Sequence, residues 1–204
     1  MTVILFTQIV FVCLLGAMSP GPSMVVVVNN AIFKNKFNGI LTAFGHGFGI
    51  GIYALFAVLG ISLIIETNLM VFNTIKILSI IFLLYLGIQS FFKETALNFD
   101  QNKMEGGGIS FLEGLSIAML NPKIFIWFIA IYSQFISIKN DIFLNISLIL
   151  IASLVDALWY VFLVNLVTYR SVLNLIKNKI KQIQKSIGVL FITISIILFI
   201  SIFL

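Results

Sequence analysis

Charged side chains are scarce in this sequence. Only 9% of the 204 residues are Asp, Glu, Lys or Arg, whereas 61% are hydrophobic. A soluble domain carries about 25% charged residues, because it must cover its surface with groups that water solvates. The composition therefore excludes a soluble globular domain and predicts an integral membrane protein.

Residues for several kinds of chemistry are also missing. The single cysteine, Cys13, rules out an internal disulfide and a thiol-relay oxidoreductase. There is no H-E-x-x-H motif, no second mid-membrane aspartate for an aspartyl pair, and no GK[ST] after the glycine run Gly106–Gly108. We therefore expect no enzyme activity, cofactor or bound metal. The net charge of +5 does not indicate nucleic acid binding, because the basic residues lie between apolar segments.

What the sequence does contain is a series of long apolar blocks. Each is close to the about 20 residues that cross a bilayer as a helix. The blocks lack the alternation of a membrane barrel, so their backbone groups must pair within helices. They cover residues 3–28, 39–65, 69–92, 110–136, 142–167 and 186–204. The predicted fold is an all-α integral membrane protein, with six transmembrane helices forming a single transporter domain over residues 1–204. Most of the abundant phenylalanine is expected to face lipid.

Basic residues are distributed unevenly between the blocks. Nine follow the first, third and fifth blocks, and two lie elsewhere, one in another loop and one near the start of the third block. The nine are Lys34, Lys36, Lys93, Lys103, Arg170, Lys177, Lys179, Lys181 and Lys185, and the two are Lys76 and Lys139. The positive-inside bias then predicts three cytoplasmic loops and both termini outside.

The chain also divides into two similar halves. A polar cytoplasmic linker, residues 93–109, separates residues 1–92 from residues 110–204, with three blocks in each half. The segment "GAMSPGP" from Gly16 is echoed by "IAMLNPK" from Ile117. An odd number of helices in each half makes the predicted repeats inverted, with helices one and four broken at proline motifs, as in many transporters.

The proline motifs indicate where a cavity lies. Pro20 and Pro22 flank Gly21, and proline lacks an N–H and clashes with the carbonyl one turn back. Carbonyl groups freed in this way cost several kcal/mol each in lipid, so a break persists where protein or a water-filled cavity satisfies them. We therefore expect Ser19 to Ser23 to line a substrate-binding cavity. A packing kink remains the alternative.

Further polar residues lie within the apolar blocks. Asn121, Pro122 and Lys123 break the fourth block, where Asn121 and the freed backbone would line the cavity. Lys123 would attract a substrate carboxylate or pair with an acid, or it could snorkel towards an interface. Asp156 lies in the middle of the fifth block, where a carboxylate usually carries protons, ions or cationic substrate groups. A structural pair with Lys123 is the alternative role for Asp156.

Two other features have a structural and a functional interpretation. His46 is either a hydrogen-bonded interior residue or, with Asp156, part of a proton path. The glycines around it, spaced by four residues as in Gly45 and Gly49, predict close helix packing. Glu113 is expected to complement the dipole at the start of its helix rather than take part in transport.

Taken together, these segments resemble the lysine exporter superfamily (LysE/RhtB type) of bacterial amino-acid exporters. The resemblance runs nearly end to end. Its carriers are "SPGP" at Ser19–Pro22, the glycine-rich "GILTAFGHGFGIGIYALFAVLG", "YLG" at Tyr85–Gly87, "FLEGLSIAMLNPK" at Phe111–Lys123 and "DALWY" at Asp156–Tyr160.

The resemblance implies a multi-pass exporter of the bacterial inner membrane that moves amino acids or close derivatives by proton antiport. It also implies a homodimer, with the two proline motifs facing each other in the pathway. Metal-ion efflux, known for distant members, is the alternative function, although few ligands are available in the blocks. A scaffold protein that transports nothing is a third hypothesis, and it predicts that the polar residues within the membrane are dispensable.

Overall fold

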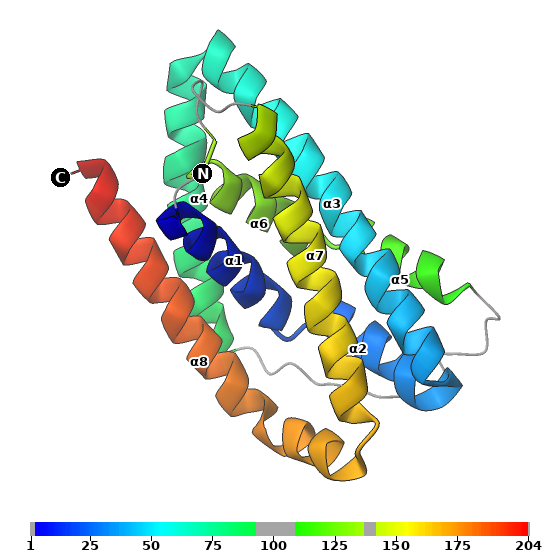
Figure 1. Cartoon of the computed structure of the whole chain (residues 1–204). Coiled ribbons are helices and arrows are strands. Elements are labelled where there is room, and N and C mark those ends of the chain that lie inside the picture. The colour runs from blue at the N-terminus through cyan, green and yellow to red at the C-terminus, as the bar shows by residue number, and fades with distance from the viewer. Residues whose placement is uncertain (1–2, 93–108, 137–141, 204) are drawn as a thin grey trace.

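The computed structural model describes residues 3–92, 109–136 and 142–203, and every regular element in these ranges is a helix (Figure 1). Almost all of the predicted linker lies outside the described residues, as does Lys139. The elements are α1 (Val3–Met18), α2 (Pro22–Asn29), the π-helical turn η1 (Asn30–Lys34), α3 (Lys36–Thr67), α4 (Leu69–Phe92), α5 (Ser110–Met119), α6 (Pro122–Tyr132), α7 (Ile142–Val167) and α8 (Arg170–Phe203).

Four of these helices, α3, α4, α7 and α8, are each long and apolar enough to cross a membrane. Two bent pairs bring the number of candidate spans to six if each pair forms one span. Asparagine side chains cap the starts of two of the long helices, α3 and α4. For example, the side chain of Asn35 accepts a hydrogen bond from the backbone N–H of Asn38 at the start of α3, at 2.9 Å.

The predicted breaks at the two proline motifs are confirmed. The axis bends by 71° between α1 and the segment formed by α2 and η1, and by 61° between α5 and α6. Pro22 and Pro122 each occupy the first turn of the second helix of a pair, where the missing N–H has no intrahelical partner to lose. Asn121 caps α6, because its side chain accepts a hydrogen bond from the N–H of Lys123 at 3.1 Å.

The last helix differs from the prediction. The basic segment that precedes the sixth block is not a loop, because α8 begins at Arg170. Val172, Leu173 and Ile176 recur at helical spacing and pack against an apolar cluster of α2, α3 and α7, while the lysines of this segment are exposed. The first turns of α8 run across one end of the molecule before the helix turns along it (Figure 1).

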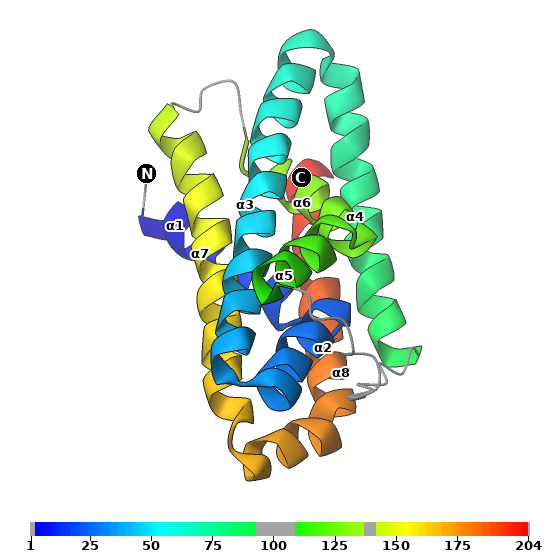
Figure 2. The ribbon, with the colours of Figure 1, turned by 90° about the vertical axis from the view of Figure 1, so that its right-hand side faces the viewer.

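That end of the molecule collects the basic segments. It contains the turn between η1 and α3, the end of α4 and the connection from α7 to α8 (Figures 1 and 2). The turn between α3 and α4 and the start of α7 lie at the opposite end, and the start of α1 and the end of α8 lie nearer to that opposite end. We call the first of these the basic end, since it carries Lys34, Lys36 and Arg170.

The glycines of α3 allow two helices to approach it closely, as predicted. A Cβ atom on Gly45 would lie 1.9 Å from the carbonyl oxygen of Phe111 in α5. One on Gly47 would lie 2.6 Å from the Cβ of Ala157 in α7. Because positions 45 and 47 face different sides of the helix, α3 is held between α5 and α7, as Figure 2 shows.

Corresponding helices of the two halves also pack on each other. Each half consists of a bent pair followed by two long helices, and α3 packs on α7 while α4 packs on α8. The contact between α4 and α8 is reciprocal, because a Cβ on Gly87 would lie 2.9 Å from the oxygen of Gly188, and a Cβ on Gly188 would lie 2.9 Å from the oxygen of Gly87. These glycines are 101 positions apart, as are Ala17 and Ala118 in the two echoed segments.

Candidate functional site

A cavity lies between the two bent pairs and brings most of the predicted site residues together. It is lined by parts of α1, α2, α3, α6, α7 and α8, and its free volume of about 50 Å³ is room for a few water molecules. The predicted residues that line it are Ser19, Gly21, Pro22, Ser23, His46, Asn121, Lys123 and Asp156. Pro20 and Pro122 are not among the lining residues.

Side chains of the two proline motifs contact each other across this cavity. The Nδ2 of Asn121 donates a hydrogen bond to the Oγ of Ser23 at 3.4 Å, and the Nζ of Lys123 donates one to the Oγ of Ser19. Both contacts join the first half of the chain to the second. Lys123 thus lies in the cavity, which favours that interpretation over snorkelling to an interface.

Asp156 pairs with His46, whereas Lys123 was the partner considered from the sequence. The Oδ2 of Asp156 lies 2.6 Å from the Nδ1 of His46, with only 5% and 2% of the two residues exposed. The ring of Tyr160 packs edge-on against the imidazole, with centroids 4.9 Å apart. The carboxylate fixes the orientation of the ring. The buried Nε2 has no hydrogen-bond partner among the described residues.

The remaining walls of the cavity are apolar, and sequence analysis missed them. Trp127 and Phe128 from α6 and Phe191 from α8 line it, and the expectation that phenylalanine faces lipid is wrong for Phe128 and Phe191, which are buried. The helical spacing of Ile124, Trp127 and Phe128 after Lys123 was a usable signal for one wall. Nothing in the local sequence distinguished Phe191.

Glu113 stands in the first turn of α5, as predicted. Its carboxylate also accepts hydrogen bonds from Lys34 and Asn30, a set of contacts that local sequence did not indicate. Across the described ranges, no group of three or more His, Cys, Asp and Glu side chains is placed to hold a metal ion.

A helical membrane protein with a partly polar cavity between two broken helices has the architecture of a secondary transporter. The comparison with known families agrees with this class. The chain belongs to the LysE type translocator family, whose family model matches residues 14–201. It is therefore a multi-pass membrane transporter and not an enzyme.

Several curated bacterial proteins are similar to this chain. The uncharacterized membrane protein YrhP of Bacillus subtilis (strain 168) is 30% identical over 163 residues, which cover 74% of this chain and 77% of that protein. The threonine efflux protein of Escherichia coli (strain K12) is 29% identical, over 65% of this chain and 66% of that protein. The leucine efflux protein of Salmonella choleraesuis (strain SC-B67) is 27% identical, over 58% and 57%. No solved structure matches the chain.

Proposed function

We propose that this translocator exports neutral amino acids across the bacterial cytoplasmic membrane in exchange for protons. The observation that carries the proposal is the presence of Lys123 and Asp156 in one cavity between the two broken helices. An amino acid presents a carboxylate and an ammonium group, and this cavity offers a charge of the opposite sign for each. The names of the threonine and leucine efflux relatives support the same substrate class.

The substrate carboxylate binds where the two proline motifs meet. Lys123 supplies the positive charge, and the first turn of α2 supplies backbone N–H groups with no intrahelical partner. Asn121 and Ser23 add side-chain donors at the same place. Discontinuous helices of transporters typically direct their helix starts at an anionic substrate group in this way.

The substrate ammonium group and a proton compete for the buried pair of Asp156 and His46. Binding of the ammonium displaces the proton from the pair, and binding of a proton releases the substrate. Because the two are mutually exclusive, substrate leaving on one side is exchanged for a proton entering from the other. This exclusivity is the basis of antiport.

The charges of the cavity also select among amino acids. Among the described residues that line it, Lys123 is the one side chain of fixed positive charge and Asp156 the one carboxylate. Both are used by the two groups that every amino acid shares. Ile124, Trp127 and Phe128 remain for the substrate side chain, so an apolar or hydroxyl-bearing side chain fits and a second charge would be unpaired.

Alternating access follows from two inverted three-helix repeats that rock against each other around the cavity. In this arrangement each bent pair forms one broken span, the basic end faces the cytoplasm and both termini lie outside. The shared element order of the halves and the reciprocal contact of Gly87 with Gly188 support the repeat relationship.

Export is tested in cells that are fed dipeptides, which load the cytoplasm with free amino acids. Cells that express the protein should release one class of neutral amino acids faster than cells with an empty vector, when all twenty are measured in the medium. Equal release of every amino acid, with the protein present in the membrane, would reject the proposal and direct attention to other solutes, metal ions included.

Removing the positive charge of Lys123 should abolish recognition of the carboxylate. The wild type is expected to export an amino acid about tenfold faster than its amide, which lacks the carboxylate. The Lys123→Met variant should export the amino acid slowly and lose this preference. Lys179→Met, at an exposed lysine of α8, is the matched control and should keep it. A Lys123→Met variant that still discriminates against the amide would show that the carboxylate binds elsewhere.

A further inference from the structure

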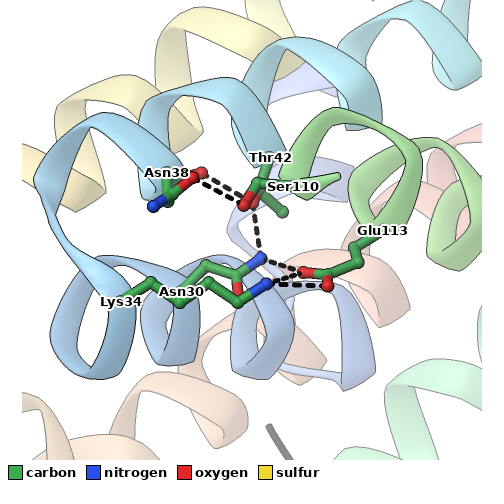
Figure 3. A network of polar contacts seen from close by, with 6 residues as sticks. All are labelled: Asn30, Lys34, Asn38, Thr42, Ser110 and Glu113. Carbon is green, nitrogen blue, oxygen red and sulfur yellow. Dashed lines mark hydrogen bonds and ion pairs between the residues drawn. The ribbon is translucent and has the colours of Figure 1, made fainter. Parts of the chain in front are cut away.

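A second polar cluster, separate from the cavity, joins the two halves of the chain near the basic end (Figure 3). The Nζ of Lys34 lies 2.7 Å and 2.9 Å from the two carboxylate oxygens of Glu113. The Nδ2 of Asn30 donates to the Oε2 of Glu113 at 2.6 Å and also to the Oγ1 of Thr42 at 2.6 Å. Asn30 and Lys34 belong to η1 at the end of the first broken segment, and Glu113 belongs to the start of the second.

Neighbouring hydrogen bonds hold this cluster in place. The hydroxyl of Thr42 donates to the backbone oxygen of Asn38 at 2.8 Å, and the hydroxyl of Ser110 donates to the side-chain oxygen of Asn38 at 2.9 Å. Figure 3 shows the side chains of α3 and α5 converging on η1 from one side. The start of α5 is therefore tied both to α3 and to η1.

The cluster lies nearer to the basic end than the cavity residues of the same or adjoining helices. The cavity residue His46 stands on α3 together with Thr42 of the cluster. η1 of the cluster follows α2, which carries the cavity residue Ser23, and α5 of the cluster ends two residues before the cavity residue Asn121. Thr42 precedes His46 by one turn of α3, which places it roughly 6 Å nearer to the basic end. η1 likewise follows the helix of Ser23 towards that end (Figure 1).

The exposure of the cluster residues to solvent increases from the interior of the protein outward. Asn30 and Thr42 are fully buried, whereas the side chains of Lys34 and Glu113 are 18% and 26% exposed. A polar contact of this kind closes a passage while η1 and α5 are together. When η1 and α5 separate, water can hydrate this contact at little cost in free energy, since the charged groups of Lys34 and Glu113 are already partly exposed. Apolar side chains at the same position would stabilise the closed state more strongly than this polar contact does.

We propose that Glu113, with Lys34 and Asn30, forms the gate that closes the cavity towards the basic end. The gate opens when η1 and α5 move apart, which admits substrate from that side, and it closes again before release on the other side. Its role in admitting substrate rests on the proposed function, but its effect on access to the cavity does not. Glu113 is thus a gating residue in addition to its position at the start of a helix.

The single cysteine of the chain permits a direct test, since Cys13 lines the cavity. A membrane-impermeant maleimide is added to inside-out and to right-side-out vesicles, and the labelling rate of Cys13 is measured. The vesicles that expose the basic end are identified by labelling Lys36→Cys in a Cys13→Ala background. No substrate is needed, so the result is independent of what the protein exports.

Loss of the ion pair should open the cavity from one side only. Glu113→Gln and Lys34→Gln are each expected to raise the labelling rate of Cys13 from the basic end about tenfold, and to leave the rate from the opposite side unchanged or lower. The double charge exchange Lys34→Glu with Glu113→Lys should restore slow labelling. Lys36→Gln, at an exposed neighbouring lysine, should behave as the wild type.

Three outcomes would overturn the gate. The first is an unchanged labelling rate of Cys13 in both single variants. The second is an equal rise of this rate from both sides, which indicates general loosening of the fold. The third is a charge-exchange variant in which Cys13 is labelled as fast as in the single variants. Lys34→Gln removes the pair at its other partner, so it keeps the test informative if Glu113→Gln does not fold. The dipeptide experiment separately tests export, so failure of the gate and failure of the proposed function are distinguishable.

Discussion

Export by the Asp156→Asn variant should fall at least about a hundredfold, to the rate of cells that lack the protein. The amide keeps the shape of the carboxylate and can still hydrogen-bond to the Nδ1 of His46, so the fold should persist. However, it carries neither the charge that attracts an ammonium group nor a site that takes up a proton. The variant therefore separates the chemistry of the buried pair from its packing.

Glu66→Gln is the matched control for this prediction. Glu66 is an exposed acid near the end of α3, far along the helix from His46, and its replacement should leave export unchanged. Both variants must be compared at equal amounts of protein in the membrane. Export by Asp156→Asn at the wild-type rate would remove Asp156 from the transport mechanism and would leave it a structural partner of His46.

The Gly45→Ala variant should be the most damaging small substitution for stability. The added methyl group would lie 1.9 Å from the carbonyl oxygen of Phe111, so α5 must move away from α3. Overpacking costs about 1–3 kcal/mol where side chains can adjust, and a backbone carbonyl adjusts less easily. Little folded protein should be recovered from the membrane, and the midpoint of thermal unfolding in detergent should fall by several degrees. Gly114→Ala, which meets the oxygen of Thr42 at 2.0 Å in the same contact, should behave alike.

Gly60 provides the control on the same helix. A methyl group at this position has no neighbouring atom within 4 Å, so Gly60→Ala should be neutral or stabilise α3 by up to about 1 kcal/mol. Equal unfolding midpoints for Gly45→Ala and Gly60→Ala would show that α3 and α5 are not as close as 1.9 Å implies. The comparison thus measures the α3–α5 contact itself rather than the general effect of removing a glycine.

Features that follow from a short stretch of sequence could be predicted. Proline cannot donate a backbone hydrogen bond, so the breaks at Pro22 and Pro122 follow from chemistry that acts within one turn. Burial of Asp156 follows in the same way, because a carboxylate in the middle of an apolar helix must face the interior of the protein. For these reasons most of the cavity-lining polar residues were identifiable before the helices were arranged in space.

Features that depend on how distant helices pack could not be predicted. His46 and Asp156 are separated by 110 residues, and Lys34 and Glu113 by 79. The rotation of each helix about its axis decides whether such side chains meet, and local sequence does not determine that rotation. In the sequence, Lys34 indicates only the orientation of the chain in the membrane, and Glu113 indicates only a favourable interaction with the helix dipole. Both interpretations consider one residue at a time. The first turns of α8 were missed because their lysines suggested a loop while their apolar residues pack on α7.

The reciprocal contact of Gly87 and Gly188 bears on the ancestry of the chain. A contact in which two equivalent residues each meet the other's oxygen is isologous, the kind that a two-fold axis generates between identical subunits. It is the contact expected if a half-length ancestor assembled as an antiparallel dimer before its gene was duplicated and fused. In such a dimer one mutation at this glycine would have placed two methyl groups in the same gap. After such a fusion the two positions could mutate separately, and this chain has glycine at both.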